Sequence, residues 1–251
     1  MQSISHALAS SLKLGSVLLN TPVQGIKQLG FNQCLVTTAG GATFRCRRVI
    51  VSVPTPLYCR IIFSPPLPTD KKVYSESTFL GDYSKFSLVY AEPWWRKLGL
   101  SGSFIDLNGP VSFSRDTSAD DDKQFSLTFF IVGDDCRKWA KLTTTERRDA
   151  ILENISDMIA TSEGRRLLYD YTDARETLWK SEQWSEGAPC PVPGPGVWER
   201  LGPSLRIPFE NIHFVGTETA FLWKGYLEGA VTSGERGARE VIQELRSNVK
   251  I

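Results

Sequence analysis

The sequence lacks the features that mark membrane proteins and proteins that bind nucleic acid. No apolar run approaches the roughly 20 residues that a membrane-spanning helix needs, and the N-terminus has no basic segment followed by an apolar one. Charge of one sign is also missing, because 29 basic residues stand against 28 acidic ones. Neither nucleic acid nor an anionic membrane is therefore favoured as a partner. We expect a soluble, cytoplasmic protein.

Histidine and paired cysteine are scarce. Only His6 and His213 carry imidazoles, and His213 lies in an apolar stretch, where a hydrogen-bonded core residue is a simpler interpretation than a base. The five cysteines are odd in number, scattered and without a C-x-x-C pair, which favours a reducing compartment and argues against zinc. The run 120–122 of three aspartates lacks the spacing and glycine of a calcium loop. We expect no metal site.

What is present predicts a globular protein of mixed α/β fold. The 251 residues, 41% of them hydrophobic, can form one large or two small domains. Apolar residues at helical spacing predict helices over 3–14 and from about 227 to 245, and a capping box at Thr143–Glu146 predicts a third. Strand patterns predict strands over 17–20, 33–38, 42–46, 48–53, 79–90, 102–115, 124–133 and 212–215.

The most informative stretch runs from residue 211 to residue 242. A short apolar strand ends at Gly216, and the helix from about residue 227 follows. Gly229, Gly234 and Gly237 each weaken that helix by about 1 kcal/mol relative to alanine, so something should approach it closely. A ligand at the helix N-terminus is one candidate, because unpaired N–H groups there favour a ring edge or a phosphate.

This stretch resembles the C-terminal signature of the flavin-containing amine oxidases, the monoamine oxidase family. In that family a strand ending in Gly-Thr-Glu leads through a Trp-x-Gly-Tyr loop into a Glu-Gly-Ala-Val helix with a following Gly-Glu-Arg. The same order is found here in Gly216–Glu218, Trp223–Tyr226, Glu228–Val231 and Gly234–Arg236. The resemblance continues through Asn20, Pro22, Val23, Ile26, Val49, Ile50, Val51 and Pro54, but it covers only the C-terminal half of a family member.

The resemblance implies a site for FAD and an amine. Lys85 corresponds to a strand lysine that holds a water against the flavin N5 atom, and is the implied catalytic residue; a solvent-facing strand lysine is the alternative. Tyr226 corresponds to one ring of the cage that orients the amine, and Pro189 stands in place of the other ring. The implied cofactor contacts are Val23, Trp179, Glu218, Tyr226 and Leu227.

The attachment of the flavin is also implied by the resemblance. Ala188 stands where animal monoamine oxidases carry the cysteine that bonds the flavin, so FAD is expected to be non-covalent. The Gly-x-Gly-x-x-Gly turn that binds the pyrophosphate in the family is absent from the sequence. The isolated chain is therefore expected to hold FAD weakly or not at all.

Residues 1–54 and 206–251 are predicted to form a partial FAD-binding domain, and residues 55–205 a substrate-binding domain, with a proline-rich joint at Ser64–Pro68. Lys85, Trp179 and Tyr226 are predicted to line one pocket. Three interpretations stay open. The chain is a truncated or split amine oxidase that oxidises an apolar or aromatic amine to an imine with FAD and oxygen, and its partner is an N-terminal-half chain. Alternatively, it is an FAD-independent pocket protein or enzyme, or a non-catalytic partner subunit that pairs with another chain or forms a homo-oligomer.

Overall fold

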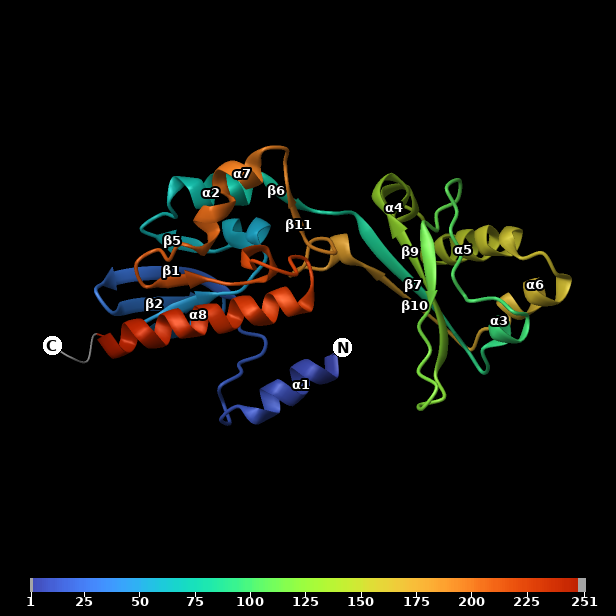
Figure 1. The fold of residues 1–251 in the computed structure, drawn as a ribbon, viewed down its shortest axis with the longest axis horizontal. Helices are drawn as coiled ribbons and strands as arrows, with labels where there is room; N and C mark the ends of the chain where they lie inside the picture. Colours follow the sequence, from blue (N-terminus) through green and yellow to red (C-terminus); the bar gives the residue numbers. More distant parts are fainter. Residues whose placement is uncertain (1, 248–251) are drawn as a thin grey trace. The chain divides into compact units, whose positions relative to one another are not determined.

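The computed structural model describes residues 2–247. The chain divides into two compact units, which are described one at a time (Figure 1). The first unit combines the residues up to Ser77 with those from Gly194 onward, and the second is the continuous segment Thr78–Pro193. In the part of the chain that the structure describes, no helix is long and apolar enough to cross a membrane.

Two sheets form the first unit. β1 (Val23–Gly30), β2 (Gln33–Thr38) and β3 (Thr43–Cys46) make an antiparallel meander, and β5 (Ile62–Ser64) lies parallel to β1, in the order β3-β2-β1-β5. β4 (Val49–Val51) pairs in parallel with β12 (Ile212–Phe214), with Val49 opposite Ile212. The two segments were predicted to share one domain although they are far apart in the sequence, and this pairing confirms that they lie in one sheet.

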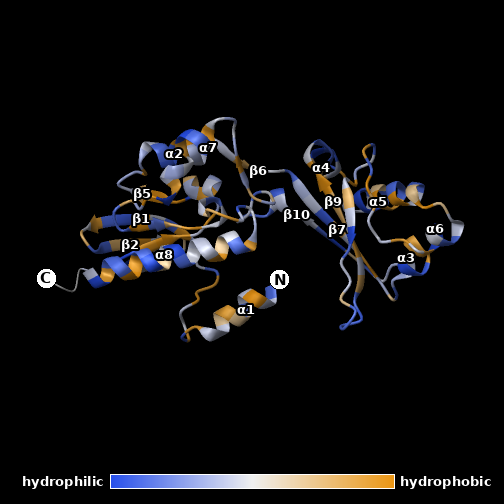
Figure 2. Ribbon diagram, in the orientation of Figure 1, coloured by the Kyte–Doolittle hydropathy of each residue, from blue (hydrophilic) through white to orange (hydrophobic). Residues whose placement is uncertain are grey.

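The helices of the first unit are α1 (Gln2–Ser11), η1 (Thr55–Arg60), α2 (Thr69–Glu76), α7 (Val197–Leu201), η3 (Gly202–Arg206), η4 (Thr217–Thr219) and α8 (Leu227–Ser247). The core between the sheets and helices contains Ile26, Val51, Tyr58, Ile212 and Phe214. In Figure 2, α8 carries both apolar and polar residues along its length, as expected for a helix with one buried face.

The glycines of α8 show which contacts require them. A Cβ atom at Gly237 would collide with the Val215 side chain, and one at Gly229 would collide with the carbonyl oxygen of Trp223. A Cβ at Gly234 would meet nothing within 4 Å. The close approach that the sequence predicted therefore exists at two of the three positions. Within the described chain, both of these contacts are made by the chain's own strand and loop.

The second unit contains an antiparallel sheet in the order β10-β7-β9-β8, formed by β7 (Tyr83–Tyr90), β8 (Phe113–Asp116), β9 (Phe125–Val132) and β10 (Asp173–Leu178). A smaller antiparallel pair joins β6 (Thr78–Leu80) to β11 (Pro191–Pro193). The helices are α3 (Trp94–Lys97), α4 (Gly133–Trp139), α5 (Thr144–Met158), α6 (Ser162–Leu168) and η2 (Trp179–Ser181).

The core of the second unit lies on one face of this sheet. Buried side chains alternate with half-exposed ones along β7, and in β9 Leu127, Phe129 and Ile131 are buried on the same face. These buried apolar side chains pack against α4 and α5. The core includes Phe86, Leu88, Leu127, Phe129, Ile131, Trp139, Ile151 and Ile155. The opposite face of the sheet carries half-exposed side chains together with the buried Thr128.

Four predicted elements are corrected by the structure. Residues 17–20 are not a strand: in residues 2–247 they pair with no other strand, and Asn20 has a φ of 54°. The strand over 79–90 is two strands, because β6 pairs with β11 and β7 pairs with β10 and β9. The strand over 102–115 is limited to β8, and the helix over 3–14 ends at Ser11.

The units divide at positions different from those suggested by the sequence. The division falls at 77/78 and 193/194, whereas the sequence suggested 54/55 and 205/206. The proline-rich segment Ser64–Pro68 lies inside the first unit, where it connects β5 to α2. The assignment of one unit to FAD and of the other to substrate stays a prediction.

Candidate functional site

In the first unit, the predicted site residues gather where the loop 223–226 leads into α8. The Thr217 hydroxyl donates a hydrogen bond to Tyr226 O (3.1 Å) and accepts one from Gly225 N (2.6 Å), so η4 fixes this loop. Trp223 and Gly225 adopt left-handed backbone, with φ of 56° and 85°. The ring of Tyr226 lies edge-on to that of Trp223, with centroids 5.9 Å apart, and is 66% exposed. An aromatic surface is therefore presented beside the first turn of α8, where Leu227 is also exposed.

The other predicted cofactor residues of this unit differ in exposure. Glu218, in η4, is 5% exposed, and its Oε1 accepts a hydrogen bond from Thr55 N at 2.9 Å. One carboxylate oxygen is thus used to join η4 to η1. Gly216, the residue before η4, has a φ of 126°, and a Cβ atom at this position would lie 3.2 Å from Glu218 Oε2. Val23, at the start of β1, is 39% exposed.

In the second unit, Lys85 lies on the face of the sheet opposite the core. It is half-buried, whereas its neighbours Ser84 and Phe86 are buried on the core side. The register places Phe130 and Thr177 beside it, and its Nζ atom is 5.5 Å from the centroid of the Phe130 ring. The pleat of β7 is the reason that Lys85 is not fully buried, because alternate residues of the strand point to opposite faces of the sheet.

Trp179 and Pro189, two further predicted site residues, also lie in the second unit. Trp179 begins η2 directly after β10, whose last residue Leu178 is paired with Ser84. Lys85 and Trp179 thus belong to two neighbouring elements of the second unit, β7 and η2. Pro189 is exposed and follows a cis peptide bond from Ala188, whose N–H donates to Gly81 O at 3.1 Å.

The face around Lys85 is aromatic and hydroxyl-rich. Phe130 stacks on Phe113 with centroids 4.5 Å apart, and Tyr83 meets Phe130 edge-on at 5.8 Å. The hydroxyls of Ser87 and Thr128 are hydrogen-bonded at 2.8 Å. Such a face can hold an apolar or aromatic amine by ring contacts. Because Tyr226 belongs to the first unit, the prediction that it shares a pocket with Lys85 and Trp179 stays a prediction.

Three cations around the end of β12 were missed by the sequence analysis. Arg236 donates to Phe214 O (2.7 Å) and to Thr219 Oγ1 (3.1 Å), and Arg206 donates to Thr219 O (2.9 Å). Lys71 is buried and donates to Ser204 O. Arg236 belongs to the Gly-Glu-Arg motif, which could have identified it, whereas α2 shows no sequence pattern that marks Lys71.

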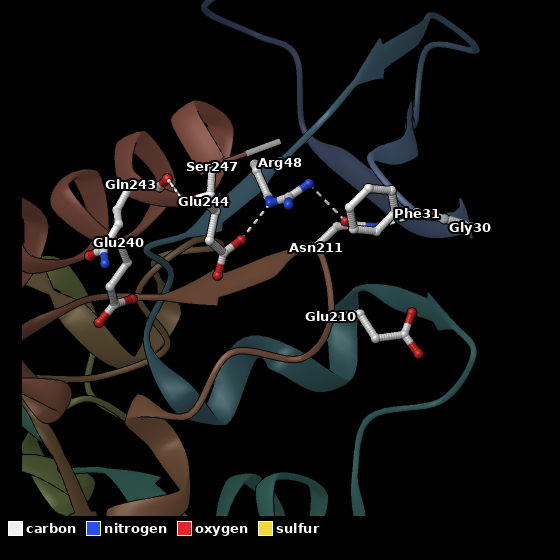
Figure 3. A pocket seen from close by; sticks show the side chains of 9 residues that line it. All are labelled: Gly30, Phe31, Arg48, Glu210, Asn211, Glu240, Gln243, Glu244 and Ser247. Atoms are coloured by element: carbon white, nitrogen blue, oxygen red, sulfur yellow. Dashed lines mark hydrogen bonds and ion pairs between the residues drawn. The ribbon is translucent and has the colours of Figure 1, made fainter. Parts of the chain in front are cut away.

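One cavity of the first unit is lined by none of the predicted site residues. It measures about 760 Å³ and is lined by residues of the β1–β2 turn, by Arg48 and Asn211 at the starts of β4 and β12, and by residues of α8 that include Glu244 (Figure 3). Arg48 Nε donates to Glu244 Oε2 at 2.7 Å. His213 is completely buried, and its Nδ1 lies 3.0 Å from Glu240 Oε2, in agreement with its predicted place in the core. Within residues 2–247, no cluster of three or more His, Cys, Asp or Glu side chains could hold a metal ion.

Comparison with known proteins identifies the family. The family described as flavin containing amine oxidoreductase matches residues 1–242. The chain belongs to this family. It is 35% identical over 244 residues to a probable flavin-containing monoamine oxidase A of Dictyostelium discoideum, and 36% identical over 231 residues to the flavin-containing amine oxidase B of Sus scrofa.

These matches cover 97% and 91% of this chain but 52% and 44% of the two relatives, so the chain spans about half the length of the amine oxidases it matches. Among solved structures, it is similar to cyclohexylamine oxidase from Brevibacterium oxydans, with a TM-score of 0.88 and 29% identity. A putrescine oxidase bound to putrescine has a TM-score of 0.85 and 30% identity. The chain covers 52% and 53% of these two structures, and 97% of it is aligned in each.

Residues at the start of α8 would suit one end of the flavin cofactor that the family implies. Tyr226 and Leu227 are exposed beside the start of α8, and Gly229 lets the loop 223–226 cross that helix closely. An exposed helix start with an aromatic neighbour suits the edge of a flavin ring. The sequence contains no glycine-rich turn for the pyrophosphate, so the other end of the cofactor has no cradle in these residues.

Proposed function

We propose that this chain provides the ring-facing and amine-facing parts of an FAD-dependent amine oxidase. The observation that carries the proposal is the family match over residues 1–242, which includes every predicted site residue. The similar solved structures are oxidases named for amines, putrescine and cyclohexylamine. The aromatic face around Phe113 and Phe130 favours an apolar or aromatic amine over a diamine charged at both ends.

Each residue has a proposed task. Tyr226 and the rings near Lys85 orient the amine so that its α-carbon faces the cofactor, and Lys85 holds a water by hydrogen bonding at the reacting edge. Trp179 excludes bulk water and packs beside the ring. When bound, FAD would accept two electrons from the amine, which leaves as an imine, and would pass them to oxygen, giving hydrogen peroxide.

Tight FAD binding is proposed to require a glycine-rich half that these residues do not supply. The pyrophosphate carries two negative charges and is normally held at a glycine-rich turn and a helix N-terminus. Without these contacts the affinity should fall by several kcal/mol, and each 1.4 kcal/mol is about tenfold in the dissociation constant.

Co-expression tests this proposal. The chain would be produced alone and with the N-terminal half of the Dictyostelium discoideum relative, and bound flavin would be measured by absorbance after gel filtration. We expect colourless protein alone, and a yellow complex that produces peroxide from an aromatic amine. Stoichiometric FAD on the chain alone would contradict the requirement for a second half.

A pair of variants separates catalysis from cofactor binding. In the yellow complex, Lys85→Met should slow amine oxidation at least about tenfold without loss of flavin absorbance, because the lysine orients a water at the reacting edge. Lys27→Met, on an exposed position of β1, is the matched control and should leave the rate unchanged. A complex that binds FAD but oxidises no amine would favour the non-catalytic interpretation.

A further inference from the structure

We propose that Cys34 and Cys46 form a redox site in which peroxide converts the two thiols to a disulfide across β2 and β3. The site goes beyond the proposed function, although that function would supply the oxidant. Its geometry depends only on strand pairing within the first unit. Both residues are free thiols in the structure.

The register places the two cysteines directly opposite each other. Cys34 of β2 is paired with Cys46 of β3, so their side chains leave the same face of the sheet. The Cys46 Sγ atom lies 3.9 Å from the carbonyl oxygen of Cys34 and is therefore directed toward β2. Cα atoms of opposite residues in an antiparallel pair are about 4.5 to 5.5 Å apart. This separation is within the range of about 4.4 to 6.8 Å that disulfides span.

The pairing also predicts how easily the bond can be reduced. Thr38 N donates a hydrogen bond to Ala42 O. Hydrogen-bonded and non-hydrogen-bonded pairs alternate along an antiparallel ladder, so Cys34 and Cys46 form a hydrogen-bonded pair. The Cβ atoms of such a pair are farther apart than those of a non-hydrogen-bonded pair. The strands must therefore draw together by up to about 1 Å to close the bond. β3 is the edge strand of its sheet, so only its pairing with β2 holds it in the sheet. A bond closed under such strain is more readily reduced than a relaxed structural disulfide.

Solvent reaches this cysteine pair from the Cys46 side. A cavity of about 420 Å³ is lined by Cys34 and Cys46 together with Arg45 and Arg47. Cys34 is 1% exposed and Cys46 is half-buried. The more exposed Cys46 is therefore the sulfur that meets peroxide, and Cys34 is the sulfur that closes the bond.

The reaction balances in two steps. The Cys46 sulfur attacks one peroxide oxygen, the O–O bond breaks, and a sulfenic acid forms with release of one water. The Cys34 sulfur then attacks the Cys46 sulfur, the S–O bond breaks, and a second water leaves with the Cys34 proton. Two electrons pass from the two sulfurs to one hydrogen peroxide.

The environment of the thiols makes the reaction slow at neutral pH. Burial raises the pKa of Cys34 to about 11, with the neighbouring Cys46 as a smaller cause, and burial also raises the pKa of Cys46. Because the thiolate is the reactive form, oxidation should accelerate as the pH rises above neutral. The site would thus respond to sustained peroxide rather than to a brief exposure.

Thiol counting by mass spectrometry tests the proposal. The reduced 251-residue chain would be treated with added hydrogen peroxide at several pH values. It would then be unfolded in urea, blocked with N-ethylmaleimide so that buried thiols also react, and weighed without reductant. We expect three labels in place of five after oxidation, a proteolytic fragment that links Cys34 to Cys46, and recovery of five labels with dithiothreitol. Because peroxide is added as a reagent, the result does not depend on whether the chain oxidises amines.

Two variants fix the assignment. Cys46→Ser should abolish the linked fragment and leave four labels, whereas Cys59→Ser, which removes an exposed cysteine outside the strand pair, should retain the link. Five labels on the oxidised wild-type chain would overturn the proposal. Oxygen added to Cys46 without a link, or a link that involves Cys59, would overturn it as well.

Discussion

Lys71 on α2 is a cation held away from water. Its side chain is 2% exposed, its Nζ atom donates to Ser204 O, and the ring of Phe214 lies 4.4 Å from that atom. Burial, with the nearby Arg236 as a smaller cause, lowers the pKa of Lys71 from 10.5 to about 8. The folded chain therefore gives up this proton at a lower pH than the unfolded chain does.

The pH dependence of stability should reveal this lysine. Between pH 8 and 10.5 the unfolded chain binds the proton and the folded chain does not, so this group makes stability rise with pH through that window, by about 3 kcal/mol in all. Lys71→Met should remove the rise, as measured by urea unfolding at pH 7 to 10.5. Lys72→Met, on the exposed neighbour, should keep it. Parallel curves for wild type and Lys71→Met would contradict the prediction.

At the scale of single elements, replacing two glycines of α8 by alanine should change the free energy of unfolding in opposite directions. An alanine side chain at Gly237 would collide with Val215 on the neighbouring strand segment, whereas Gly234 has open space. We expect Gly237→Ala to lower the free energy of unfolding by about 1 to 2 kcal/mol, because overpacking outweighs the gain in helix propensity. Gly234→Ala should raise it by up to about 1 kcal/mol. Urea unfolding midpoints measure both, and equal shifts would show that the contact with Val215 is unimportant.

The elements that the sequence predicted well are those with local signals. The capping box at Thr143 is present, with Glu146 N donating to Thr143 Oγ1 and Thr143 N donating to Glu146 Oε2. β12 and α8 lie where their motif predicted them. The segment 17–20 has strand composition, but a strand also needs a partner, and composition carries no information about one. The end of β6 near Gly81 likewise depends on a distant segment, because a Cβ at Gly81 would lie 2.8 Å from Ala188 O.

The candidate site was predictable only as far as the family motif extends. Tyr226, Trp223 and Gly225 were identified by their order in the sequence, and the structure adds that the Thr217 hydroxyl holds the loop in place. Lys71 and Arg206 act on β12 and η4 from segments far away in the chain. Such contacts depend on tertiary packing, which neither periodicity nor spacing encodes.

At the scale of the whole molecule, the second unit should fold by itself. Residues 78–193 are continuous, and their core of buried side chains is drawn entirely from that segment. A fragment of these residues should show a cooperative urea transition and a near-ultraviolet circular dichroism signal from buried Trp94, Trp95 and Trp139. The fragment from the N-terminus to residue 77 lacks β12 and should show neither. A non-cooperative transition for residues 78–193 would contradict the prediction.

The pairing of β6 with β11 has a consequence for the order of synthesis. β4 emerges from the ribosome long before its partner β12, and the second unit lies between them in the chain. When that unit folds, β6 and β11 bring its two ends together, and Gly194 N donates to Ser77 O at 3.2 Å. The loop that β4 and β12 must close is then much shorter than the intervening sequence, and its entropic cost falls with the logarithm of its length. We therefore expect the second unit to fold first and to hold residues 77 and 194 together, and β4 and β12 to pair afterwards.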